Sequence, residues 1–140
     1  MASRRFTQVI VLDTSGVFAA LAVDDQHHAE AVAVLEGDRG PFVIPAGILA
    51  EVGYMIETKL GAPVLDAFLE DIISGAFSFD CGDADMPRIR ELVGRYADLP
   101  LGLADASVVA CAERTTGPIL TFDRRDFGVV AREGRVDLVP

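Results

Sequence analysis

The sequence has little of what marks secreted, membrane-bound or thiolate-metal proteins. Its two cysteines, Cys81 and Cys111, match no metal-binding spacing, so we expect them to stay reduced in a cytosol. No apolar run approaches the roughly 20 residues that a membrane span needs. The run that follows Arg4 and Arg5 stops at Asp13, which is too short for a signal peptide. These absences predict a cytoplasmic protein without a membrane partner.

Basic residues are also scarce. The chain has 12 Lys and Arg against 22 Asp and Glu, which gives a formal net charge of −10. This balance argues against a protein that holds nucleic acid by broad electrostatic attraction, and it suits a local site or the binding of cations. Lys59 is the single lysine, and the other basic residues are arginines. Arginine favours two-pronged contacts with phosphate or carboxylate over diffuse charge.

Apolar residues make up 51% of the 140 residues and no tract is of low complexity, so the chain predicts one domain with its own core. The spacing of the apolar residues predicts the order β-α-α-β-α-α-β-α-α-β-β, an α/β sandwich around a mainly parallel sheet. The predicted strands are 9–12, 41–44, 77–80, 119–122 and 136–139, and the predicted helices are 16–22, 26–35, 45–60, 63–73, 86–96 and 103–113.

Four acidic residues fall in comparable places in this pattern. Asp13 and Asp123 each follow a short apolar strand, Asp105 lies in the first turn of a helix, and Glu51 lies on a helix entered from a strand. Ligands of open α/β sheets bind at the carboxyl ends of the strands, so the four side chains could share one edge. Each also has a simpler interpretation. Asp13 or Thr14 could cap the following helix, and Glu51 could simply reach solvent.

If the four carboxylates meet, their mutual repulsion calls for a cation or a bound proton. Oxygen ligands without paired His or Cys favour Mg²⁺ or Mn²⁺, and a site of this kind suits hydrolysis of a phosphodiester. His27 and His28 lie in the first turn of a predicted helix, where a metal-ligand role is possible but no second ligand is spaced with them.

Four segments resemble the PIN-domain family and, within it, the VapC toxins of bacterial type II toxin–antitoxin pairs. They are Val11–Ser15 (VLDTS), Leu49–Val52 (LAEV), Tyr96–Ser107 (YADLPLGLADAS) and Thr121–Phe127 (TFDRRDF), and they occur in the expected order. The resemblance covers essentially the whole chain. It implies a PIN-like three-layer α/β/α sandwich with a mainly parallel sheet of four to five strands, in a single domain over residues 1–140.

The resemblance also implies an activity and partners. It implies an endoribonuclease dependent on Mg²⁺ or Mn²⁺ that cleaves structured RNA such as tRNA or rRNA. It implies a homodimer, and neutralisation by a small VapB antitoxin. By motif match, Asp13, Glu51, Asp105 and Asp123 carry the metal and the water. Many relatives have a further acid where this chain has Gly102, and Asp98 could support the site.

The acidic balance makes RNA contacts through a few local side chains the simplest expectation. Arg124, Arg125, Arg132 and Arg135 are the candidates, and surface ion pairs with nearby acids are their alternative. Thr14 or Ser15 could bond a metal-bound water, or could cap a helix. The broad apolar stripe of residues 64–73 could meet a partner chain or pack into the core.

Two other functions stay open on the sequence alone. An aspartate-based phosphatase or a phospho-acceptor receiver domain also places an aspartate after its first strand. The phosphatase needs a second acid where this chain has Ser15, and the receiver needs a late lysine that is missing here. A PIN-fold module that only binds a partner is the second alternative, although all four acids are present.

Overall fold

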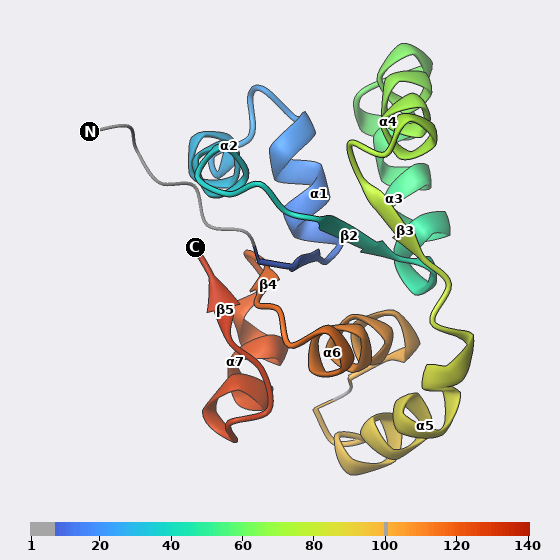
Figure 1. The fold of residues 1–140 in the computed structure, drawn as a ribbon, viewed down its shortest axis with the longest axis vertical. Helices are drawn as coiled ribbons and strands as arrows, with labels where there is room; N and C mark the ends of the chain where they lie inside the picture. The colour runs from blue at the N-terminus through green and yellow to red at the C-terminus, as the bar shows by residue number, and fades with distance from the viewer. Residues whose placement is uncertain (1–7, 100) are drawn as a thin grey trace.

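The computed structural model describes residues 8–99 and 101–140. A parallel sheet of five short strands runs through its centre, in the order β3-β2-β1-β4-β5 (Figure 1). The strands are β1 (Ile10–Leu12), β2 (Phe42–Pro45), β3 (Ser78–Asp80), β4 (Ile119–Leu120) and β5 (Leu138–Val139). The predicted α/β class and the number of strands are therefore confirmed.

Helices cover both faces of the sheet, so the three-layer arrangement is confirmed as well. Figure 1 shows α1 and α2 on one side and α6 and α7 on the other. The helices are α1 (Thr14–Leu21), α2 (His28–Glu36), α3 (Ala46–Lys59), α4 (Ala62–Ser74), α5 (Met86–Arg95), α6 (Leu103–Thr115) and α7 (Arg124–Arg132), with a 3₁₀ turn, η1 (Asp83–Asp85), before α5.

The central strand and the helix behind it are the most deeply buried elements. Ile10, Val11 and Leu12 of β1 are at most 2% exposed, as expected for a strand covered on both faces. In α6 the seven residues from Ala106 to Ala112 are all buried. Small side chains let this helix lie close to the sheet, and its first turn is thereby fixed at the carboxyl edge of the strands.

One helix was missed by the sequence pattern. Residues 124–132 form α7, whereas the prediction passed directly from the fourth strand to the last. Arg124 and Arg125 make its first turn strongly polar, and Gly128 in its middle adds no apolar side chain to the pattern. The two buried apolar residues that anchor the helix, Phe127 and Val130, are a weak signal in so short a segment.

The remaining differences concern element ends. Pro45 is the last residue of β2 and precedes α3, whereas we predicted it inside the first helical turn. Asp25 accepts a hydrogen bond from the backbone of His27 just before α2, which begins at His28 rather than at residue 26. Asp85 precedes α5 without a side-chain cap, because its carboxylate binds Arg114 instead.

The predictions for residues 1–7 lie outside the described residues. Among the residues that the structure does describe, no helix combines the length and the apolar character needed to cross a membrane.

Candidate metal centre

Asp13 lies at the carboxyl end of β1 and its side chain is buried. One oxygen, Oδ1, accepts hydrogen bonds from the backbone N–H of Gly16 at 2.7 Å and from the Ser15 hydroxyl at 2.8 Å. The first bond caps α1, so the simpler interpretation of Asp13 as a helix cap is correct. The same carboxylate also faces the end of β4, so capping does not exclude a place in the site.

Two hydroxyl groups connect the end of β1 to the end of β4. Thr121 donates to Oδ2 of Asp13 at 2.5 Å and accepts from the backbone N–H of Asp123 at 3.0 Å. Ser15 donates to Asp13 and accepts from the backbone N–H of Phe122 at 2.9 Å. These bonds fix the position of Asp13 relative to Asp123, although the two residues are far apart in sequence.

Three further carboxylates meet beside this hydroxyl pair. One oxygen from each of Asp105, Asp123 and Asp126 lies within 4.8 Å of the others, which is close enough for a shared cation. The Oδ1 atom of Asp126 is buried and has no hydrogen-bond partner among the described residues. A buried carboxylate oxygen without a donor is costly unless a cation or water binds it. The donor set therefore fits a hard divalent ion.

Burial and mutual repulsion disfavour the charged forms of two of these acids. Desolvation raises the pKa of Asp13 to about 6, although hydrogen bonds from Thr121, Gly16 and Ser15 oppose the rise. The pKa of Asp105 rises to about 7, first through desolvation and then through the charges of Asp123 and Asp126. A site that raises the pKa of its own acids is suited to hold a positive charge.

Glu51 occupies the margin of this group. Its side chain is exposed on the second turn of α3, as the simpler interpretation predicted, and it lies outside the close set of three carboxylates. Its charge nevertheless contributes to the raised pKa of Asp105. The charges of Asp13, Asp123 and Glu51 all act on Asp105, so the four predicted acids lie in one region, and Glu51 is the exposed member. Asp98 is exposed after α5 and does not belong to the close set.

The histidines have other contacts. The ring of His27 stacks on Phe122 with centroids 4.4 Å apart, and Nδ1 of His28 lies 2.8 Å from the carbonyl oxygen of Ala19. Neither belongs to the group of possible ligands among the described residues.

The candidate RNA-binding residues differ in whether an acidic side chain already contacts them. Arg135 bonds the hydroxyl of Tyr96 at 2.8 Å and pairs with Glu133 at 3.7 Å, so the ion-pair alternative holds for it. The side chain of Arg125 is 90% exposed, with Asp126 3.8 Å away. Arg124 and Arg132 are exposed without a carboxylate within 4.0 Å among the described residues. Thr14 is half-buried in the first turn of α1.

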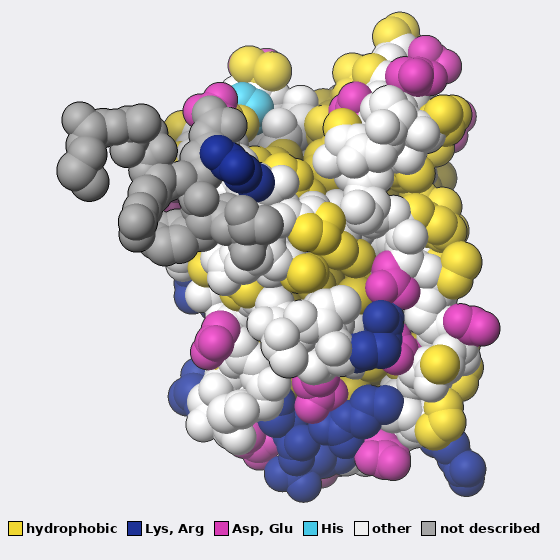
Figure 2. Space-filling model, viewed as in Figure 1, with side chains coloured by type: hydrophobic (Ala, Val, Ile, Leu, Met, Phe, Trp, Pro, Cys, Tyr) yellow, Lys and Arg dark blue, Asp and Glu magenta, His cyan; other side chains and the backbone are white. Residues whose placement is uncertain are grey.

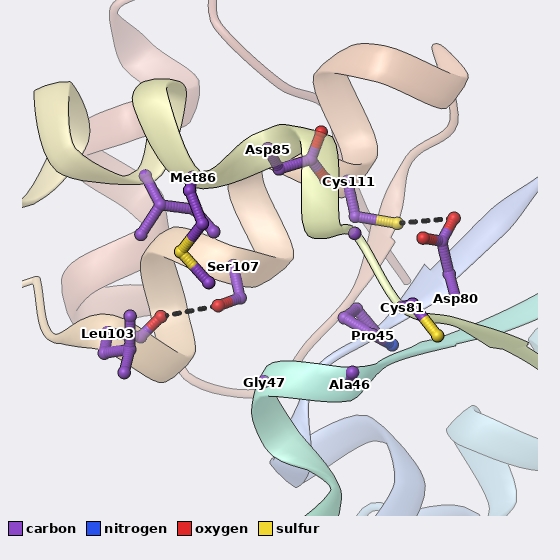
Figure 3. A pocket seen from close by; sticks show the side chains of 12 residues that line it. Pro45, Ala46, Gly47, Asp80, Cys81, Asp85, Met86, Leu103, Ser107 and Cys111 are labelled. Carbon is purple, nitrogen blue, oxygen red and sulfur yellow. Dashed lines mark hydrogen bonds between the residues drawn. The ribbon is translucent and has the colours of Figure 1, made fainter.

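A separate cavity of about 220 Å³ lies between the start of α3 and helices α5 and α6 (Figure 3). Its lining is mainly apolar, with Met86 and Leu103 at one side and Pro45, Ala46 and Gly47 at the other. The Ser107 hydroxyl, which faces this space, donates to the carbonyl oxygen of Leu103 at 2.8 Å. None of the clustered acids lines it, so it is distinct from the candidate metal centre.

Sequence reasoning missed two contributors to the centre. Asp126 was treated only as an ion-pair partner because α7 was not predicted, whereas in a helix the three-residue spacing from Asp123 places both acids near one end. Thr121 was treated as a strand residue, and its signal was its place two residues before Asp123.

The fold and the carboxylate cluster together match a known class. Residues 10–133 match the model of the PIN domain, and the chain belongs to the PIN-domain family. Over 135 residues it is 30% identical to Ribonuclease VapC26 of Mycobacterium tuberculosis, a match that covers 94% of this chain and 100% of that protein.

Solved structures agree on the fold. VapC20 of Mycobacterium tuberculosis, described as a sarcin-ricin loop cleaving toxin, has a TM-score of 0.76 at 21% identity, covering 94% of this chain and 99% of that one. VapBC2 from Rickettsia felis, bound to a DNA fragment from its promoter, has a TM-score of 0.68 at 16% identity, covering 94% and 97%. FitAcB from Neisseria gonorrhoeae reaches 0.59 at 18% identity, covering 94% and 97%.

Proposed function

We propose that this protein is a metal-dependent endoribonuclease that hydrolyses phosphodiester bonds of RNA. The observation that carries the proposal is the cluster of Asp105, Asp123 and Asp126, in which one oxygen of each lies within 4.8 Å of the others and the buried Oδ1 of Asp126 accepts no hydrogen bond among the described residues. The relative named as a ribonuclease supports the choice of RNA. Mg²⁺ or Mn²⁺ suits the oxygen-only donor set.

In this proposal the clustered aspartates hold the ion and Asp13 completes the charge around it. Ser15 and Thr121 keep Asp13 oriented through their hydrogen bonds. Glu51, which is exposed and whose charge acts on Asp105, would accept a proton from the water that attacks the substrate. A divalent ion bound here would lower the pKa of its water and stabilise negative charge on the phosphate oxygens. Thr14 and Arg125 lie close enough in sequence to these acids to contact substrate at the rim.

We further propose that the whole of residues 1–140 acts as one PIN domain in the cytoplasm, on structured RNA such as tRNA or rRNA. A VapB-type antitoxin would neutralise it, and the similarity in fold to VapBC2 and FitAcB supports a partner of this kind. A homodimer would cover part of α4, where Phe68 is buried but Leu69 and Ile73 are 42% and 78% exposed.

The test is cleavage of total RNA by the isolated protein with Mg²⁺ or Mn²⁺ and with EDTA. Cleavage should require the metal, and Asp105→Asn should abolish it while the protein stays folded. Asp66→Asn is the matched control, because this exposed carboxylate on α4 lies outside the cluster. Cleavage that persists in EDTA, or in the Asp105 variant, would reject the metal assignment. A folded protein that binds RNA or an antitoxin without cleaving would instead be a silent binding module.

A further inference from the structure

A groove runs between α7 and the last strand of the sheet. It has a volume of about 340 Å³ and lies against the strand segment 136–138. Its other wall is one face of α7, formed by Arg124, Gly128, Ala131 and Arg132. Residues 124, 128 and 132 recur every four positions and therefore share a stripe of the helix. Asp137 is the single acid among the lining residues.

The two arginines of this groove differ from most arginines of the described chain. Arg88, Arg95, Arg114 and Arg135 each lie within 4.0 Å of a carboxylate. Figure 2 shows blue and magenta side chains intermixed at the lower end of the face it presents. Neither Arg124 nor Arg132 has such a partner among the described residues. In a chain with a net charge of −10, two arginines with no carboxylate side chain of the described residues beside them make a local positive site, although Arg124 also bonds the main-chain oxygen of Pro140.

One end of the groove lies next in sequence to the candidate metal centre, although none of the clustered acids lines it. Arg124 directly follows Asp123, and its Nη2 donates to the carbonyl oxygen of Pro140 at 2.9 Å, just beyond β5. Because β5 is parallel to β4, the ends of both strands lie at the same edge of the sheet as the clustered acids. From Arg124 to Arg132, the axis of α7 rises by about 12 Å, at 1.5 Å per residue.

Gly128 lies between the two arginines on this face of α7. A Cβ atom at position 128 would lie 3.5 Å from Nη1 of Arg132, so the guanidinium lies back over the helix toward the glycine.

We propose that this groove holds the phosphate backbone of the RNA strand as it leaves the metal centre, through Arg124 and then Arg132. The proposal rests on the proposed ribonuclease function. Guanidinium groups suit phosphate, with five donors each, and Arg124 directly follows Asp123 of the carboxylate cluster. The proposal also explains how an acidic protein can bind RNA, because the contacts are confined to one face of α7.

The experiment measures binding and cleavage separately. A short fluorescent single-stranded RNA is titrated in EDTA at several salt concentrations, using the wild type, Arg132→Gln and the double variant Arg124→Gln/Arg132→Gln. Each lost phosphate contact should reduce the slope of log K against log salt by about 0.7, and so by about 1.4 in the double variant. Arg90→Gln is the control, because Arg90 is an exposed arginine of α5 that does not line the groove.

Cleavage with Mn²⁺ is then followed on the same variants. Arg132→Gln should raise KM for RNA more than it lowers kcat, since Arg132 lies a helix length from the reacting acids. Equal slopes for the wild type, both groove variants and the Arg90 control would overturn the groove proposal, and so would a wild type that binds no RNA. Altered slopes with no cleavage by the wild type would reject the nuclease function but keep the groove. Weaker binding of an acidic antitoxin peptide, with RNA binding unchanged, would assign the groove to that peptide instead.

Discussion

Replacing Asp13 by asparagine tests whether the site acids destabilise the metal-free protein. Burial raises the pKa of Asp13 to about 6, from an ordinary value of 3.8. A carboxyl group whose pKa is higher in the folded state stabilises the fold while it is protonated, below the unfolded-state pKa. That contribution is lost as the pH rises through the folded-state pKa. The metal-free wild type should therefore lose stability between about pH 4 and pH 7.

The size of the loss follows from the two pKa values. Their difference corresponds to about 3 kcal/mol of unfolding free energy, at 1.36 kcal/mol per pKa unit. About 1.4 kcal/mol of this falls between pH 5 and pH 8, because the unfolded chain is already ionised at pH 5. Asparagine keeps an oxygen to accept the N–H of Gly16 but carries no charge. Removing the charge should also lower the pKa of Asp105, which Asp13 helps to raise.

The assay is urea unfolding in EDTA at pH 5 and pH 8. Asp13→Asn should lose less stability than the wild type between these two values, by about 1.4 kcal/mol or more. Asp66→Asn, which alters an exposed carboxylate on α4, should behave as the wild type. Saturating Mg²⁺ at pH 8 should stabilise the wild type more than the Asp13 variant. If the unfolding free energies of the wild type and Asp13→Asn change equally between pH 5 and pH 8, the ionised Asp13 does not destabilise the fold and the reasoning fails.

Three further outcomes are expected. Thr121→Val removes the donor to Asp13 and the acceptor for Asp123, so it should lower stability in urea by about 1–3 kcal/mol and weaken metal affinity in calorimetry by about 10–100-fold. Unchanged affinity would show that the hydroxyl does not orient the site. Gly16→Ala should lower the melting temperature, with a cost of about 1–3 kcal/mol or more, because its Cβ would overlap the carbonyl oxygen of Leu120; a melting temperature equal to the wild type would contradict this. Mg²⁺ at 100 times its Kd should add about 2.7 kcal/mol at pH 8, and no shift at millimolar Mg²⁺ would count against the site.

Much of the fold was predictable because its central strands are short apolar runs buried on both faces. Residues 10–12 and 119–120 have this character, and their parallel pairing follows from the helices between them. The last helix was not predictable in the same way. It is held by Phe127 and Val130 within an otherwise polar segment, so its stability comes from packing that only the folded protein supplies.

The site was predictable as a location rather than as a set of contacts. Strand ends followed by acids indicated where Asp13 and Asp123 would lie. The hydroxyl of Thr121 and the carboxylate of Asp126 depend on the local path of the chain after β4, which the apolar pattern does not record. Selecting Arg124 and Arg132 among the arginines likewise required knowing which of the others are bound to acids.

The bond between Asp13 and Thr121 joins positions 108 residues apart. During translation, Asp13 would therefore leave the ribosome long before Thr121, Asp123 and Asp126 are synthesised. Products truncated before residue 121 would lack Thr121, Asp123 and Asp126 and so would lack the proposed activity. The proposed nuclease activity would therefore appear only after α7 had been synthesised, near the end of translation.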